Sequence, residues 1–342
     1  MNAGRVATSN GGLLVGVDIG GTKTAILIAE PDGIVVGHHL APTAVGAPER
    51  AADAIAGLVV TALADAGAAP QDVAALGVGV PGRVDREHGE VTMAVNLDWH
   101  DLPLGPRLEA RLGIPTFLEN DVRAAALGLH RRRVFGEAHS LAFLAIGTGI
   151  SAGVVLDGRL HRGAAGLAGE IGHVVVDPNG RRCACGMTGC FETLAAGPAI
   201  VARAMAGWAK SDDFPERRNL RPIGADAVFA AAGVGDPVAI QVIEDAGRAI
   251  AWGVHLLALA YNVEILVLGG GVSHAGEPFM APIRRELDRY RASSQLAKEV
   301  LVPDLVQLLP PGADAGAWGA LTIAREALSA APVAARREVG HA

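Results

Sequence analysis

The stretch that decides the fold is residues 13–29, LLVGVDIGGTKTAILIA, in which a glycine- and threonine-rich turn separates two apolar runs. An Asp-Gly turn at 32–33 and a third strand-like run, IVVGHHL, follow it. A second segment repeats this order: LAFLAI, then GTGIS at 147–151, then AGVVLDGRLH with Asp-Gly at 157–158. Each copy predicts three strands joined by tight turns. The repeat predicts two related α/β domains, each of which presents a glycine turn to a shared cleft.

The glycine turns have the composition of phosphate-binding loops. Glycine adopts positive φ and lets the backbone approach a ligand closely, and successive free N–H groups attract phosphate oxygens. A third glycine turn, LGGGV at 268–272, directly follows the strand-like run VEILVL. Ordinary hairpin turns, and a tight strand-to-helix connection at 268–272, are the alternative interpretations.

Two further motifs match known signatures but are rejected. The stretch 77–82, GVGVPG, fits G-x-G-x-x-G, but Pro81 and a turn-like stretch follow where a dinucleotide fold requires a helix. The stretch 149–153, GISAG, fits the hydrolase motif G-x-S-x-G, but its continuation VVLDGRL reads as a strand. The sequence therefore predicts neither a dinucleotide fold nor a serine hydrolase.

Composition limits the class of protein. The chain of 342 residues is half hydrophobic and 19% charged, which fits a globular protein of about two domains. Lys and Arg number 29 against 36 Asp and Glu, and this acidic balance argues against a nucleic-acid partner. The most apolar long segment, 249–261, is shorter than the roughly 20 residues of a membrane span. No signal-peptide pattern is visible, so no membrane association is expected.

All the cysteine of the chain lies in one short window. Cys183, Cys185 and Cys190 follow the segment GEIGH, which ends at His173. One imidazole and three thiolates are a complete tetrahedral ligand set for Zn²⁺, with no position open for water, so the predicted zinc is structural. Free buried thiols and a redox role are the alternatives. An odd number of cysteines cannot all pair within the chain, and a reduced, cytoplasmic location fits best.

These motifs together resemble the ROK family of sugar kinases. The resemblance rests on DIGGTK at 18–23, LEND at 118–121, GTG at 147–149, GEIGH at 169–173 and CACGMTGCFE at 183–192. It covers roughly residues 13–328 and is strongest toward the zinc-containing bacterial glucokinases. It implies ATP-dependent phosphorylation of the 6-hydroxyl of a hexose, most simply glucose to glucose 6-phosphate.

The family implies an actin-like (ribonuclease H-like) two-domain ATPase fold with the ligand cleft between the lobes. We expect a small N-terminal α/β domain over 13–122, completed by a C-terminal helix near 314–329. A large α/β domain over 123–313 then carries the zinc segment. Residues 1–12 and 331–342 are expected to be flexible tails. A homodimer is what the family suggests.

The resemblance assigns roles in phosphoryl transfer, which needs held phosphates, a charge-spreading metal and a base aimed at the acceptor hydroxyl. Asp121 is the predicted general base, and Asp18 is expected to face the Mg²⁺ that accompanies ATP. Read from composition alone, Asp121 is a helix N-cap and Asp18 opens an Asx turn. Lys23 is either close to the phosphates or an exposed hairpin lysine. The predicted ATP contacts are Asp18, Gly20, Gly21, Thr22, Lys23, Gly147, Thr148, Gly149, Gly269, Gly270 and Gly271.

Matching to the family also places polar residues around the sugar, whose hydroxyls are best recognised by carboxylates and amides. His173 is assigned two roles, because it binds zinc through one ring nitrogen and donates to the sugar from the other. For Glu170 and Glu192 the alternative role is to orient the zinc ligands, and for Asn96 it is a plain turn. The predicted sugar contacts are Gly82, Asn96, Asn120, Asp121, Glu170, His173 and Glu192.

One departure from the family pattern bears on the substrate. Many relatives carry a small residue and then Asn after the catalytic Asp, whereas this chain has Val122 and Arg123. Arg123 is either a surface helix residue or one that alters the sugar or phosphate contacts. Kinases for N-acyl mannosamine or glucosamine, fructose or a C7 cyclitol stay open, as does polyphosphate as donor. A sugar-sensing transcription regulator is disfavoured, because about 17 residues precede Asp18 and no helix-turn-helix is visible.

Overall fold

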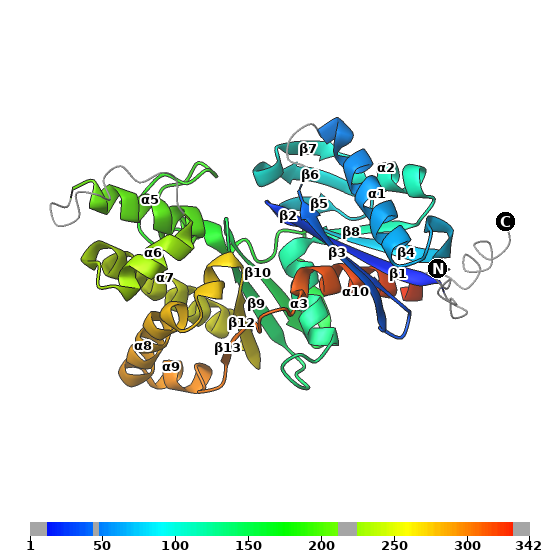
Figure 1. Cartoon of the computed structure of the whole chain (residues 1–342). Helices are drawn as coiled ribbons and strands as arrows, with labels where there is room; N and C mark the ends of the chain where they lie inside the picture. Colours follow the sequence, from blue (N-terminus) through cyan, green and yellow to red (C-terminus); the bar gives the residue numbers. More distant parts are fainter. Residues whose placement is uncertain (1–11, 44–47, 211–223, 331–342) are drawn as a thin grey trace. The chain divides into compact units, whose positions relative to one another are not determined.

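The computed structural model describes residues 12–43, 48–210 and 224–330 (Figure 1). The predicted tails lie outside these residues except for Gly12. The chain divides into two compact units. The first unit comprises Met1–Gly136, Arg162–Leu167 and Asp314–Ala342, and the second comprises Glu137–His161 and Ala168–Ala313. The second unit is thus inserted into the first.

The first unit is built on a five-stranded mixed sheet with the strand order β3-β2-β1-β4-β8. β2 pairs antiparallel with β1 and β3, whereas β4 runs parallel to both β1 and β8. A separate three-stranded sheet contains β5 (Arg83–Asp85), β6 (Glu90–Ala94) and β7 (Trp99–Leu102). The strands of the main sheet are β1 (Leu13–Ile19), β2 (Lys23–Ala29), β3 (Val35–Pro42), β4 (Val73–Val80) and β8 (Thr116–Asn120).

Helices cover both faces of this main sheet. α1 (Pro48–Asp65) and α2 (Leu104–Leu112) share a buried core with the side chains of Val15 and Val17 in β1. Leu14 points to the opposite face, where it packs with buried residues of α10 (Ala315–Ala330). This division follows from strand geometry, because successive side chains of a strand point to opposite faces.

α10 lies close to the sheet because two strands carry glycine beneath it. A Cβ built at Gly16 in β1 or Gly77 in β4 would overlap the backbone of α10 at Ala317 and Ala320. α10 also packs tightly along α3 (Asp121–Arg131), where Gly128 faces the backbone of Gly319. α3 therefore belongs to the first unit, which continues to Gly136, whereas the sequence analysis placed the boundary at residue 122.

The second unit repeats the sheet of the first. Its strand order is β11-β10-β9-β12-β13, with β10 antiparallel to β9 and β11 and with β12 parallel to β9 and β13. The five strands correspond one by one to those of the first unit, so the duplication predicted from the glycine turns is confirmed. These strands are β9 (Leu141–Ile146), β10 (Ile150–Leu156), β11 (Arg159–His161), β12 (Ile265–Gly269) and β13 (Val306–Leu308).

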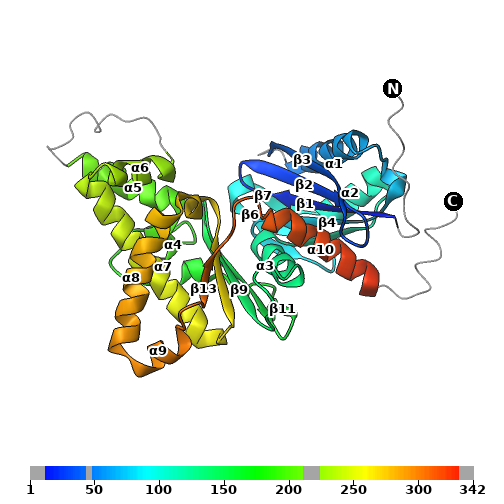
Figure 2. The same ribbon diagram turned by 60° about the horizontal axis from the view of Figure 1, so that its bottom comes forward.

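The helices of the second unit share one large buried core with its sheet, and α7 packs along α8 (Figure 2). Within the residues that the structure describes, no single helix is long and apolar enough to cross a bilayer. The consecutive helices α6 and α7 pass that test only as a pair bent by 117°. The helices are α4 (Glu192–Ala195), α5 (Gly197–Trp208), α6 (Ala225–Gly233), α7 (Pro237–Tyr261), α8 (Glu277–Ser293) and α9 (Gln295–Val300).

Both rejected motifs are followed by strands, as the sequence predicted. After β4 and Gly82 the chain enters β5, and after Gly149 it enters β10. Neither position offers the helix that a dinucleotide site or a nucleophile elbow requires.

Candidate functional site

Asp18 lies near the end of β1 in a space made by two glycines. In the register of the sheet it pairs with Gly79 of β4, and a Cβ built at Gly79 would lie 3.4 Å from Asp18 Oδ1. On the other side, a Cβ built at Gly316 of α10 would overlap the carboxylate of Asp18. Glycine at residue 316 is therefore needed to leave room for this side chain, whereas a Cβ at residue 79 would only touch it.

Two further carboxylates share the electrostatic environment of Asp18. Burial, as the largest cause, together with the charges of Asp121 and Asp314 raises the pKa of Asp18 to about 7. Asp314 precedes α10 and had no role assigned from the sequence; its Oδ2 lies 3.6 Å from His38 Nε2. Carboxylate oxygens are the ligands that Mg²⁺ prefers, so this donor set fits a magnesium ion.

The junction of β8 and α3 presents Asp121. Asn120, not Asp121, is the N-cap of α3, because Asn120 Oδ1 accepts a hydrogen bond from Arg123 N at 3.1 Å. The N-cap interpretation of Asp121 was therefore wrong by one residue. Asp121 is the first helical residue, and its Oδ1 accepts from Val122 N at 2.9 Å. The capping bond fixes the turn from which the Asp121 carboxylate projects.

Asn120 also joins the junction to Gly82, another predicted sugar contact. Asn120 Nδ2 donates to the carbonyl oxygen of Gly82 at 3.1 Å. Gly82 has φ +88°, and a Cβ there would overlap the carbonyl oxygen of Met93. Asn96 is exposed in a short 3₁₀ helix, Val95–Leu97, that follows directly after β6. The structure thus brings Gly82 and Asn120 into contact and places Asn96 on the neighbouring hairpin.

Arg123 is not a surface residue. Its side chain is 2% exposed, and its Nε donates to the fully buried Glu119 at 3.1 Å. The sequence analysis singled out Arg123 but missed this partner. Spacing alone did not reveal the pair, because Glu119 lies in β8 and only Arg123 lies in α3.

The first glycine turn is held by a threonine that the sequence analysis missed. Within the turn, Gly20 N donates to Lys23 O at 2.9 Å. Thr43, which follows β3, donates its hydroxyl to Gly20 O at 2.8 Å and its N–H to Thr22 O at 3.0 Å. Thr22 and Lys23 are exposed at the tip. These bonds hold the backbone of the turn and leave its tip accessible.

The other two glycine turns lie together in the second unit. Gly147 N donates to Gly149 O at 2.9 Å, and Gly147 O accepts from Gly197 N, at the start of α5, at 2.8 Å. A Cβ built at Gly147 would lie 3.8 Å from Gly271 N. Gly270 has φ +89°, and a Cβ there would press on the Ile146 backbone at 2.5 Å. Glycine is therefore required at residue 270 by the tight connection after β12.

The predicted zinc ligands converge. His173 Nδ1 and the Sγ atoms of Cys183, Cys185 and Cys190 all lie within 4.8 Å of one another. Cys183 Sγ is 3.6 Å from His173 Nδ1, and Cys185 Sγ is 3.6 Å from Cys190 Sγ. Donors around a tetrahedral zinc with bonds of 2.0–2.3 Å are roughly 3.5–3.8 Å apart. The geometry and the donor types are compatible with zinc.

Glu192 lies between this cluster and the second glycine turn. Its Oε1 accepts a hydrogen bond from Cys183 Sγ at 3.1 Å and lies 3.6 Å from His173 Nδ1. Its Oε2 would lie 3.3 Å from a Cβ at Gly149. Glu170 precedes the 3₁₀ helix Ile171–His173, and the adjacent Gly169 O accepts from Ala152 N at 2.8 Å. The GEIGH segment is thus held against β10.

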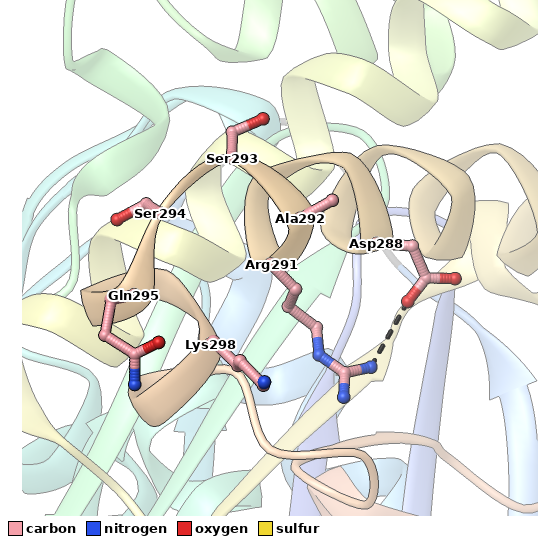
Figure 3. Close-up of a pocket in the computed structure, with 7 residues that line it drawn as sticks. All are labelled: Asp288, Arg291, Ala292, Ser293, Ser294, Gln295 and Lys298. Atoms are coloured by element: carbon pink, nitrogen blue, oxygen red, sulfur yellow. Dashed lines mark hydrogen bonds and ion pairs between the residues drawn. The ribbon is translucent and has the colours of Figure 1, made fainter.

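Two hollows lie on the second unit. One, of about 450 Å³, lies at the turn between α8 and α9, where the Arg291 guanidinium pairs with Asp288 and faces Lys298 (Figure 3). The other, of about 540 Å³, lies between α5 and the start of α7. Neither is lined by a residue predicted to bind sugar, nucleotide or metal.

Comparison with known proteins gives consistent relatives. A family model described as "ROK family" matches residues 14–327. A glucokinase of Thermotoga maritima is 36% identical over 327 residues, which cover 92% of this chain and 97% of the relative. An N-acetylmannosamine kinase of Shigella flexneri is 33% identical over 281 residues, with coverage of 80% and 88%.

A solved structure of a ROK family protein is also similar to this chain. It is the ROK family glucokinase from Streptomyces griseus in complex with glucose and AMPPNP, with a TM-score of 0.77 and 33% identity over 92% of this chain and all of that one. This likeness confirms the predicted actin-like, two-domain α/β fold class.

Proposed function

The chain belongs to the ROK family, and we propose that it is an ATP-dependent sugar kinase that transfers the γ-phosphoryl group to the 6-hydroxyl of a hexose, glucose first among them. The observation that carries this proposal is the pair of acidic residues in the first unit. Asp121 begins α3, and its charge raises the pKa of Asp18 at the end of β1. The family match extends over both residues and over all three glycine turns.

Asp121 is the proposed general base. Its carboxylate accepts the proton of the sugar 6-hydroxyl as that oxygen attacks the γ-phosphorus, and ADP departs. The N-cap bond of Asn120 and the bond from Val122 N hold the first turn of α3. They therefore limit the directions in which the base points, which is the positional control that such catalysis needs.

Asp18 is proposed to hold Mg²⁺ through water, since Mg²⁺ keeps much of its hydration shell. Bound Mg²⁺ supplies neutralisation of charge on the β- and γ-phosphates. The backbone N–H groups around Gly20–Thr22 and Gly147–Gly149 are proposed to bind the phosphates. Gly269–Gly271 is proposed to admit the adenosine.

The proposed sugar contacts fall into two sets along the chain. Gly82, Asn96, Asn120 and Asp121 lie in the first, and Glu170, His173 and Glu192 lie in the second. The amide of Asn120 already caps α3 and binds Gly82, so its remaining N–H is the group proposed for the sugar. His173 directs Nδ1 toward the thiols, and its Nε2 is the nitrogen proposed for the sugar.

The four-donor cluster is proposed to bind a structural zinc ion. His173, Cys183, Cys185 and Cys190 supply four ligands, so no position is left for an activated water. The zinc supplies folding free energy to this loop when bound. Glu192, in contact with Cys183, would be held in position by the same loop.

A second candidate substrate is an N-acyl hexosamine, which the relative from Shigella flexneri favours. Arg123 is buried, and its Nε donates to Glu119. The departure from the family pattern at this residue therefore does not by itself point to a different sugar.

The deciding experiment is a coupled assay of ADP formation with MgATP and a panel of glucose, mannose, fructose, N-acetylmannosamine, N-acetylglucosamine and a cyclitol. We expect the highest kcat/KM with glucose. A preference for an N-acyl sugar supports the second candidate. Turnover with none of the panel contradicts the proposed function. Polyphosphate in place of ATP, in the same assay, tests the donor.

We also propose that the protein is a cytoplasmic homodimer. Support for the compartment comes from the three thiols, which are free in the structure and must stay reduced to bind zinc. Sedimentation velocity tests the dimer, and a monomer at micromolar concentration contradicts it.

A further inference from the structure

Glu119 is a buried carboxylate that the proposed mechanism does not use. It lies on β8 directly before Asn120, and its side chain is 0% exposed. In the register of the sheet, Glu119 pairs with Gly79, which pairs with Asp18. Neighbours in register point to the same face of a sheet. Glu119 therefore shares its face with Asp18, two strands away.

Three arginines from three different segments converge on this one carboxylate. Arg123 Nε donates to Glu119 Oε1 at 3.1 Å. Arg162 Nε donates to Oε2 at 2.7 Å, and Arg86 Nε lies 3.3 Å from the same oxygen. Together they form the Glu119 cluster, which consists of Glu119, Arg86, Arg123 and Arg162.

Each member of the Glu119 cluster is close in sequence to a proposed sugar contact. Arg86 follows β5, the strand that comes directly after Gly82. Arg123 is in the first turn of α3, two residues after Asp121. Arg162 opens Arg162–Leu167, the excursion that the chain makes into the first unit before it returns to the second ahead of Glu170.

Glu119 also binds the backbone at the junction of β8 and α3, which presents Asp121. Its Oε1 accepts a hydrogen bond from Asn120 N at 3.0 Å. One carboxylate thus restrains the peptide before Asp121, the helix after it, and two further segments. A buried carboxylate of this kind persists only when paired, and its charge organises all its partners at once.

The charges keep Glu119 ionised. Burial alone would raise the pKa of Glu119, but Arg162, Arg123 and Arg86 together hold it below its usual value. Burial and the neighbouring Arg162 likewise lower the pKa of Arg86. With three guanidinium groups around one carboxylate, removal of that carboxylate leaves like charges facing one another.

We propose that Glu119 is a positioning residue for sugar phosphorylation, which acts through Arg86, Arg123 and Arg162 to align the segments that carry the sugar contacts and the base. The proposal rests on the proposed function. It predicts a selective effect on the sugar, because the glycine turns are held by other bonds. The Gly20 turn is held by Thr43, and the Gly147 turn is joined to Gly197.

The competing interpretation is that these ion pairs only stabilise the fold. The two interpretations differ in what kinetics shows. Loss of folded protein lowers Vmax in proportion to the active fraction and leaves both KM values unchanged. Misalignment of sugar contacts raises the KM for sugar and leaves the KM for MgATP in place.

The test compares Arg162→Gln and Arg162→Lys with Arg111→Gln. Arg111 is the matched control, because it forms an ion pair with Asp53 at the surface of the same unit. We expect Arg162→Gln to raise the glucose KM about 10-fold or more with the MgATP KM within about twofold, since small misplacements cost that much. Arg162→Lys keeps the charge and is expected to be intermediate, and Arg111→Gln to match the wild type.

Backbone amide hydrogen exchange gives a second measurement, which requires neither sugar nor MgATP. The Asn120 amide donates to Glu119, so Glu119→Gln and Arg162→Gln are expected to speed its exchange more than that of the Gly147–Gly149 turn. An unchanged glucose KM together with unchanged exchange at Asn120 overturns the proposal. If the wild type phosphorylates no sugar, the proposed function fails, while exchange at Asn120 still decides whether the Glu119 cluster holds the junction.

Discussion

The carboxylate of Asp18 rests against the backbone of Gly316, so closely that no side chain at residue 316 fits beneath it. Gly316 is the second residue of α10, a helix that lies far from β1 in the sequence. The position of the Asp18 carboxylate therefore depends on how closely α10 packs against β1.

Gly316→Ala tests this relationship. The added methyl group would overlap Asp18, so we expect the KM for MgATP to rise about 10-fold or more as the carboxylate moves. Gly57→Ala in α1 is the control, because a Cβ there meets no atom within 4 Å. Alanine at residue 57 should stabilise the protein by about 0.5–1 kcal/mol. Wild-type kinetics for Gly316→Ala would contradict the role of Asp18.

The pH dependence of magnesium binding follows from Asp18. Its pKa is raised to about 7, so below that pH the metal must displace a proton. The apparent affinity for Mg²⁺ should rise with pH and level off above pH 7. Asp314→Asn removes one of the charges that raise this pKa, so the rise should move to lower pH. Titration of MgATP-dependent activity from pH 5.5 to 8.5 checks both expectations, and coincident profiles would refute the link to Asp314.

The free energy of unfolding of the metal-free protein should also depend on pH through Asp18, but it should fall as pH rises, whereas the affinity for Mg²⁺ should increase. The folded protein holds a proton on Asp18 between the ordinary pKa of 3.8 and about 7, whereas the unfolded chain does not. The free energy of unfolding contributed by Asp18 is thus fully present below pH 3.8 and is lost as pH rises to about 7. The free energy of unfolding is measured with urea for the wild type and for Asp18→Asn, and the difference between the two isolates this contribution. A difference that does not vary with pH argues against it.

Asp121→Asn separates the base from its structural neighbours. Asparagine retains an oxygen that accepts from Val122 N, so α3 should begin unchanged. Loss of a general base typically lowers kcat by 10²–10⁴-fold. Calorimetry should show glucose binding close to that of the wild type. Retention of more than about a tenth of wild-type kcat would exclude Asp121 as the base.

Removal of the thiol cluster should affect the sugar as well as the fold. Cys190→Ser removes one of four donors, so zinc content should fall from about one per chain toward zero. The glucose KM should rise by about 10–100-fold, because Glu192 and His173 lose their support. Met187→Ala, in the same loop and 55% exposed, is the control. Equal zinc in Cys190→Ser and wild type would remove the metal proposal.

Much of the fold could be predicted from local pattern. The two glycine turns lie between antiparallel strands, and both Asp-Gly turns have positive φ at glycine, as hairpins of this kind require. The cysteines and His173 converge because the ligands lie close in sequence and the loop contains glycines. Such features depend on residues that are close in sequence, so the local pattern is enough to predict them.

What could not be predicted depends on contacts between distant segments. Nothing near Arg162 in the sequence indicates that it pairs with Glu119, or that residues 162–167 join the first unit. The role of Gly316 is likewise visible only once α10 lies against β1. The N-cap at Asn120 was missed for a smaller reason, since Asn and Asp are both good caps and adjacent candidates are hard to rank.

The insertion of the second unit between α3 and α10 sets the order in which the protein is completed on the ribosome. Residues 137–313 are translated before α10, so the sheet of the first unit waits with the face bearing Gly16 and Gly77 uncovered. A nascent chain halted before residue 314 exposes apolar surface to chaperones and proteases. The proposed magnesium site is therefore completed last during biosynthesis, after the inserted unit has had time to fold.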